Sequence, residues 1–273
     1  MKIYDSAQRP KPFISQLKAI YDSRDLLRLL VNRDLTVRYK RSVIGVWWSL
    51  LNPIFTTGVL FYVFNTVFKS RMANGTSFLP YLLCGVLLVT FFNQGMTMAA
   101  DSVAGGAGIL TKVYVRPEVF AASATISSAI NFCFGLVPLT AVLLVSGKHP
   151  GLKSPLVLIV IFCMILLTTG LGLMLAVAYI NFDDSRSLIG ILLLMLQYIT
   201  PVFYPISVLG PHTLAVIKLN PLTSFLIVFR NVYGGNGTTG WHMWAYMIVS
   251  SIAIFILGFY VFAQKWPKVV AKI

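Results

Sequence analysis

Long apolar stretches without Asp, Glu, Lys or Arg constrain this chain more than any other feature of its sequence. A helix needs roughly 20 apolar residues to cross about 30 Å of hydrocarbon. Five stretches are long enough: 44–68, 78–100, 119–146, 155–180 and 241–264. The chain is 57% hydrophobic and 11% charged, whereas a soluble domain carries about 25% charged residues. The sequence therefore predicts an all-α membrane protein.

A sixth apolar stretch is interrupted by proline. It begins at Leu188 and meets Pro201 and Pro205. Proline ends a helix because it lacks an amide donor and its ring clashes with the preceding turn. The following segment, 206–240, is too apolar for an ordinary loop and too interrupted to cross the membrane, and irregular backbone at that depth has to be shielded by protein or a water-filled cavity. We therefore expect six transmembrane helices, with re-entrant helices between spans 5 and 6.

The distribution of basic residues predicts the orientation. If both termini are cytoplasmic, 16 of the 22 Lys and Arg residues lie on the cytoplasmic side and 6 on the outer side, and all 8 acidic residues are cytoplasmic. An excess of Lys and Arg marks the cytoplasmic loops of membrane proteins. The same rule accounts for the net charge of +14, so we expect membrane contact and no nucleic-acid partner.

A cationic amphipathic segment, 23–42, precedes the first span. Its polar positions recur every fourth residue, and leucine and valine lie opposite them: Arg24, Arg28, Asn32 and Thr36 against Leu27, Leu30, Val31 and Leu35. A basic face opposite an apolar face is typical of a helix in the membrane interface. Trp47 and Trp48 follow, where aromatic belts lie. Two interpretations stay open: a simple anchor, or an anchor that also forms the wall of a socket for a cytoplasmic partner.

Sequence signatures of catalysis and of nucleotide binding are missing. Gly147-Lys148 is followed by His149 rather than Ser or Thr, and no Gly-x-Ser-x-Gly or His-Glu-x-x-His occurs. The six apolar stretches contain no Asp, Glu, Lys or Arg, although ion-coupled carriers usually need an ionisable group inside the membrane. We therefore expect no catalytic or metal-ligating residue and an energy source outside the chain. The alternative is a membrane-embedded glycosyl- or prenyl-transferase that uses Asp183 and Asp184.

Polar and aromatic side chains inside the spans are candidates for lining a passage. In the first span they recur at steps of four and three from Trp48 to Thr66, so they share one helix face. Aromatic rings stack on the apolar faces of sugars, and amides bind their hydroxyls. Ordinary helix packing explains the same pattern, so both interpretations stay open. The candidates for a sugar path are Trp48, Asn52, Phe55, Tyr62, Asn93, Gln94, Gln197, Tyr198 and Tyr204.

Several short motifs follow one another along the chain. They are Arg33-Asp34-Leu35; Arg38-Tyr39-Lys40 with Ser42, Gly45 and Trp48, then Asn52-Pro53; Ile109-Leu110 with Lys112, Tyr114 and Pro117; Thr200 to Pro205; and Asn220-Pro221 with Arg230-Asn231. In this order, over about 20–270, they resemble the permease subunits of type-2 ABC exporters, in the polysaccharide-export branch that moves O-antigen, teichoic acid or galactan. Phe182-Asp183-Asp184 departs from the family, which often has an Arg-Asp pair there.

The resemblance implies a homodimer in the bacterial cytoplasmic membrane, docked on separate ATPase subunits that bind ATP and Mg, so that the permease itself needs no cofactor. It implies export of a lipid-linked glycan. The family's coupling helix falls near 104–117, and the residues expected to dock the ATPase are Arg33, Arg38, Lys112, Tyr114 and Arg116. An exporter of a drug or small lipid is the alternative.

The expected organisation has four parts. They are a cytoplasmic tail at 1–22, the amphipathic interfacial helix at 23–42, one six-span domain at 43–264 and a cytoplasmic tail at 265–273.

Overall fold

The protein is described by a computed structural model at residues 21–40, 45, 47–64, 78–106, 116–151, 153–182, 184–234 and 239–270. All regular secondary structure within these ranges is helical. The helices are α2 (Arg24–Tyr39), α3 (Trp47–Tyr62), α4 (Phe78–Gly105), α6 (Pro117–Val145), η2 (Ser154–Leu156), α7 (Val157–Asn181), α8 (Ser185–Ile199), η3 (Ile206–Val208), α9 (Pro211–Leu219), α10 (Pro221–Gly234) and α11 (Trp241–Val270).

Four described helices are long and apolar enough to cross a membrane: α4, α6, α7 together with η2, and α11. The count rises to five if α9 and α10, which meet at an angle of 96°, form one broken span. At the expected first and fifth spans lie α3 and α8, with 16 and 15 residues as described. At 1.5 Å per residue such helices reach only about 22–24 Å. The all-helical membrane architecture is therefore present, with four or five spans by length and composition.

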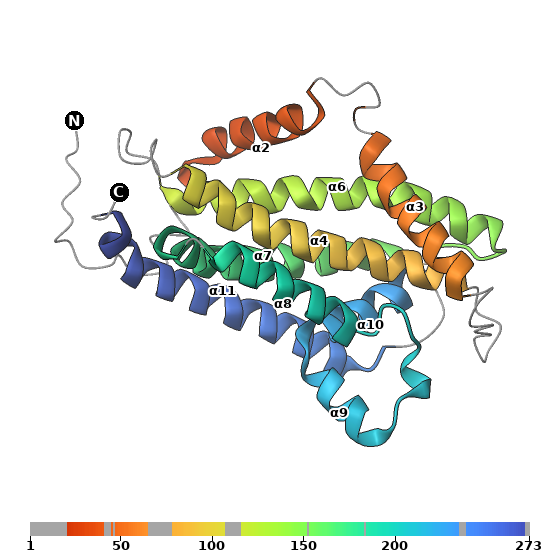
Figure 1. Ribbon diagram of the computed structural model, residues 1–273. Helices are drawn as coiled ribbons and strands as arrows, with labels where there is room; N and C mark the ends of the chain where they lie inside the picture. Colours follow the sequence, from red (N-terminus) through yellow and green to blue (C-terminus); the bar gives the residue numbers. More distant parts are fainter. Residues whose placement is uncertain are drawn as a thin grey trace.

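The long helices lie side by side in a bundle, with α6 running opposite to α4, α7 and α11 (Figure 1). A different apolar cluster lies toward each end of the bundle. One cluster joins Leu30 of α2 to the C-terminal parts of α4, α7 and α11 and the N-terminal part of α6. We call this the α2 end. The larger cluster joins the opposite halves of these helices to α10, and we call this the α10 end. The chain thus alternates between the two ends, as expected of sequential spans.

Contact between α7 and α11 is close because both helices carry glycine where they cross. A methyl group on Gly258 would lie 2.2 Å from the carbonyl oxygen of Gly170, and one on Gly170 would lie 2.6 Å from the carbonyl oxygen of Ile254. Small residues at such crossings let membrane helices gain packing that larger side chains prevent. The pair therefore fixes the separation of α7 and α11.

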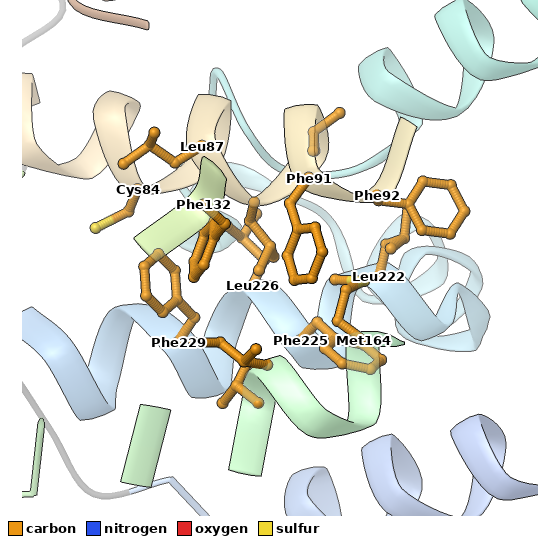
Figure 2. Packing of buried hydrophobic residues seen from close by; sticks show 14 of the residues in the cluster. Cys84, Leu87, Phe91, Phe92, Phe132, Met164, Leu222, Phe225, Leu226 and Phe229 are labelled. Carbon is orange, nitrogen blue, oxygen red and sulfur yellow. The ribbon is translucent and has the colours of Figure 1, made fainter. Parts of the chain in front are cut away.

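Helix α10 is held inside the bundle by aromatic side chains. Phe225 and Phe229 are fully buried, and Figure 2 shows them among side chains of α4, α6 and α7. The Phe229 ring lies 5.3 Å from that of Phe132, which lies 5.1 Å from that of Phe91. These spacings suit favourable ring contacts. The surrounding helices therefore shield this side of α10 from lipid.

Helix α2 packs against α6 with the face that the sequence pattern assigned as apolar. Leu30 and Val31 are buried, whereas Arg24 and Arg28 on the other face are exposed. Leu29 and Val37 are also exposed, at 62% and 63%. Part of the apolar surface of α2 is therefore left without a protein neighbour within the described residues.

Replacing Gly258 by alanine should destabilise the protein by about 1–3 kcal/mol, because the added methyl group meets backbone atoms that cannot rotate away. Thermal unfolding of the detergent-solubilised protein measures the effect. Gly190→Ala in α8 is the matched control, since a methyl group there meets nothing within 4 Å. Equal melting temperatures for the two variants would contradict the assignment of a tight crossing.

Candidate functional site

A cavity of about 320 Å³ opens between the C-terminal end of α2 and helices α3, α4 and α6. Its walls combine one guanidinium, amides, hydroxyls and aromatic rings. The lining residues are Arg38, Gly45, Trp48, Asn52, Pro53, Leu87, Thr90, Phe91, Gln94, Ser128, Asn131 and Phe132. The volume lies at the lower end of the range of small-ligand pockets, about 300–1,000 Å³.

Helical spacing explains why these residues face one space. On α4, Leu87, Phe91 and Gln94 recur at steps of four and three, so their side chains share a face. Trp48 and Asn52 recur at a step of four on α3. Gly45, with φ of 57°, lies between α2 and α3 in a backbone conformation that glycine adopts without strain. The cavity is therefore lined by residues of four helices, α2, α3, α4 and α6, and by Gly45.

The guanidinium of Arg38 lies against α4 in this cavity. Its Nη1 donates to Oε1 of Gln94 at 3.5 Å, and its Nη2 contacts the sulfur of Met98. The hydroxyl of Ser128, another lining residue, also donates to this sulfur, at 3.6 Å. A thioether is a weak acceptor. Neither described hydrogen-bond partner of the Arg38 guanidinium carries a charge.

The structure brings three of the predicted path residues together and separates the others. Trp48, Asn52 and Gln94 line the cavity. Phe55 and Tyr62 lie on α3 outside it, 61% and 67% exposed. Asn93 is adjacent to Gln94 but is not among the lining residues. The roles of all these residues remain predictions.

The other path candidates lie where α8 ends. Gln197 is half-buried and Tyr198 is 61% exposed. The hydroxyl of Tyr204 donates to the carbonyl oxygen of Ile199 at 2.9 Å, so this side chain satisfies a backbone acceptor that the end of α8 leaves open. Tyr204 thus has a local structural contact in addition to its predicted role.

The predicted docking residues are separated as well. Arg33 donates to its neighbour Asp34 at 2.8 Å on the surface of α2, and Arg116 is the N-cap residue of α6. Both helix positions belong to the α2 end. Lys112 and Tyr114 lie outside the described residues. Arg38 lines the cavity, and its docking role stays a prediction.

An exposed ion pair joins two helices at the same end. Arg186 at the start of α8 lies 3.2 Å from Asp101 near the end of α4, and its guanidinium is also 5.4 Å from the centre of the Tyr179 ring. Exposed pairs of this kind contribute about 0–1 kcal/mol. Asp184 is exposed beside this pair in sequence, and Asp183 lies outside the described residues. The pair therefore positions the start of α8 only weakly.

Arg230 forms several hydrogen bonds that the sequence analysis did not predict. Arg230 of α10 donates to the carbonyl oxygens of Pro201 at 2.8 Å, Val202 at 3.0 Å and Tyr81 at 3.1 Å. Its guanidinium carbon lies 3.4 Å from the centre of the Tyr81 ring. We call these contacts the Arg230 clasp. The sequence signal that could have indicated these contacts is Arg230 itself, a single arginine in an apolar segment after Pro201 and Pro205.

Further hydrogen bonds complete the connection around the interrupted segment. The hydroxyl of Tyr81 donates to the carbonyl oxygen of Tyr204 at 2.9 Å. The amide of Asn220 donates to Oγ1 of Thr200 at 2.9 Å, while its Oδ1 accepts from the backbone of Leu222 at 3.0 Å. Asn220 therefore caps α10 and ties it to the end of α8, as capping residues satisfy free backbone donors.

Replacing Arg230 by methionine should destabilise the protein by about 1–3 kcal/mol, because buried carbonyl groups lose their donor. The stability of Arg230→Lys should lie between those of the wild type and Arg230→Met, since lysine keeps the charge but lacks the planar guanidinium. Melting temperature in detergent measures both. Lys218→Met on the exposed side of α9 removes the same charge and should leave stability unchanged; a loss of stability as large as that of Arg230→Met would contradict the clasp.

Comparison with known proteins matches residues 25–233 to the ABC-2 type transporter family. The chain is 25% identical over 242 residues to the O-antigen export system permease protein RfbA of Klebsiella pneumoniae, covering 87% of this chain and 91% of that protein. It is 27% identical over 223 residues to RfbA of Myxococcus xanthus, covering 81% and 84%. Similarity to the capsule polysaccharide export inner-membrane protein BexB of Haemophilus influenzae is 19% over 241 residues, covering 85% and 88%. Because the family match extends over most of its length, this chain belongs to the ABC-2 type transporter family.

Proposed function

We propose that the chain is the permease subunit of an ATP-driven exporter that moves a lipid-linked polysaccharide across the cytoplasmic membrane. The observation that carries the proposal is the agreement among relatives matched over most of both chains: they are named as permeases or inner-membrane proteins for export of O-antigen or capsule polysaccharide. The aromatic and amide lining of the cavity supports it, because such groups bind sugars.

The topology that we propose has six spans and cytoplasmic termini. The first span includes α3 and the fifth includes α8, while α9 and α10 form the re-entrant helices. The α2 end is cytoplasmic, because the positive-inside rule places the segments around α2, the α4–α6 connection and the end of α11 there. We keep 43–264 as one transmembrane domain with tails at 1–22 and 265–273.

Helix α2 lies in the inner membrane interface in this proposal. Leu30 and Val31 already pack on protein, so the exposed Leu29 and Val37 are the side chains left to meet lipid. The ATPase docks at the α2 end, on Arg33, Arg116 and the segment with Lys112 and Tyr114. Nucleotide binding in the partner would then bias the helices that end there.

A second copy of the chain completes the passage. The outward face of α3 presents exposed polar side chains, Asn52 and Thr56, beside exposed Phe55 and Tyr62. Polar groups are costly against lipid, and membrane proteins turn them toward a protein neighbour or a water-filled space. The exposed Tyr198 on α8 extends the candidate surface. We infer that these faces of α3 and α8 meet their counterparts in a homodimer around the glycan path.

Reconstitution tests the function directly. The permease and its ATPase, placed together in vesicles, should hydrolyse ATP faster with a lipid-linked polysaccharide than without it, and should move the glycan across the membrane. A labelled glycan that becomes accessible to an impermeant hydrolase on the far side measures transport. Vesicles with an active ATPase that neither respond to the glycan nor move it would refute the function.

Trp48→Ala and Tyr62→Ala should each reduce transport by up to about tenfold without reducing assembly with the ATPase, because an aromatic ring contact contributes about 0.5–1.5 kcal/mol. Transport rate and the yield of co-purified complex measure the two effects. The matched controls are Trp241→Ala and Tyr260→Ala on α11, exposed residues of the same types outside the proposed path. Equal loss of transport and assembly would instead identify Trp48 and Tyr62 as packing residues.

A further inference from the structure

Arg38 differs from Arg33, Arg186 and Arg230 in its hydrogen-bond partners. Arg33 pairs with Asp34, and Arg186 pairs with Asp101. Arg230 donates to backbone carbonyl groups of three residues. Arg38 has one amide oxygen at 3.5 Å and one thioether sulfur, and no carboxylate of the described residues forms an ion pair with it. A guanidinium carries five donors, so most of these donors have no hydrogen-bond partner within the described residues.

The cavity combines this guanidinium with other polar groups and with aromatic rings. Arg38 and Gln94 lie within reach of each other on its wall, and the hydroxyl of Ser128 contacts the same sulfur as the guanidinium. The rings of Trp48 and Phe132 supply apolar surface beside this polar group. One part of the cavity is thus cationic and polar, and another part is aromatic.

We propose that this cavity binds a phosphate or diphosphate ester through the guanidinium of Arg38, with the lipid headgroup of the exported glycan as its source. A guanidinium binds phosphate oxygens through two parallel hydrogen bonds, which are stronger than bonds between neutral groups. The inference rests on the proposed function and extends it, because it assigns recognition to the anionic linkage between lipid and glycan. The aromatic wall then receives the first sugar.

The lining residues place the cavity along the bundle. Arg38 belongs to the last turn of α2, and Trp48 lies in the first turn of α3 on the other side of Gly45. Leu87, Phe91 and Phe132 on the opposite walls belong to the cluster of the α10 end. A headgroup held by Arg38 would therefore lie within the bundle, between its two ends, and would enter the cavity from the interface.

The test is equilibrium binding of a radiolabelled polyprenyl diphosphate to the purified permease–ATPase complex in detergent. Arg38→Gln should weaken binding at least tenfold, and Arg38→Lys should weaken it severalfold because lysine keeps the charge without the fork. Arg28→Gln removes the same charge from the exposed face of α2 and should bind as the wild type does. If Arg38→Gln does not assemble, Arg38→Lys alone decides the matter.

Competitors identify what is recognised. The matched polyprenol, which lacks phosphate, should not displace the label, and inorganic diphosphate should displace it only at far higher concentration. Displacement by polyprenol as effective as by the diphosphate, or unchanged affinity of Arg38→Gln and Arg38→Lys, would overturn the proposal. If inorganic diphosphate displaced the label equally well, the lipid headgroup would not be the source of the bound phosphate. The cavity would then be assigned to a free phosphate compound.

Glycan transport measured on the same preparations separates the two proposals. Wild-type complex that binds the polyprenyl diphosphate but exports no glycan would refute the proposed function and leave the Arg38 cavity standing. Wild-type complex that exports glycan while Arg38→Gln binds the label normally would refute the cavity's assignment and leave the function standing.

Discussion

Backbone groups where a helix is interrupted need hydrogen-bond partners inside an apolar bundle, and the Arg230 clasp supplies donors to three carbonyl groups there. After α8 ends, the carbonyl groups of Pro201 and Val202 have no helical partner, and Arg230 donates to both. Leaving these groups without a donor away from water costs about 1–3 kcal/mol. The bent pair of α9 and α10, which we propose to be re-entrant, is therefore tied to the end of α8 by one side chain of α10.

The clasp and the cavity share structural elements. Seating α10 brings Phe229 against Phe132, and Phe132 against Phe91. These last two rings also line the cavity that holds Arg38. The packing of α10 and the shape of the cavity are thus set by the same side chains of α4 and α6, and a shift of α10 would have to repack the cavity wall because bundle interiors contain little free volume.

Sequence patterns predicted those features of the fold that depend on local periodicity and length. The buried and exposed faces of α2 follow from the four-residue spacing that begins at Arg24, and the four long helices follow from apolar runs. Trp48, Asn52 and Gln94 were predicted from chemistry alone, and the structure places all three in one cavity. Their common location depends on how α3 packs on α4, which periodicity within one helix does not specify.

Features that depend on the contacts between helices could not be read from the sequence. The family resemblance implied a docking role for Arg38, but no pattern in the sequence showed that its side chain contacts Gln94 of α4. The three carbonyl partners of Arg230 are separated from it by 28 to 149 residues, beyond any local pattern. In the sequence, Phe225 and Phe229 indicate only that this segment is apolar. Their complete burial depends on the surrounding helices.

The most direct test of this account is a structure of the permease–ATPase complex with its lipid-linked glycan bound, determined by electron cryomicroscopy with a hydrolysis-deficient ATPase. The account predicts two permease copies facing each other through α3 and α8, with the phosphorylated linkage against Arg38 and sugar rings beside Trp48 and Tyr62. Glycan density elsewhere on the bundle, with no ligand in the Arg38 cavity and α3 facing lipid, would contradict it.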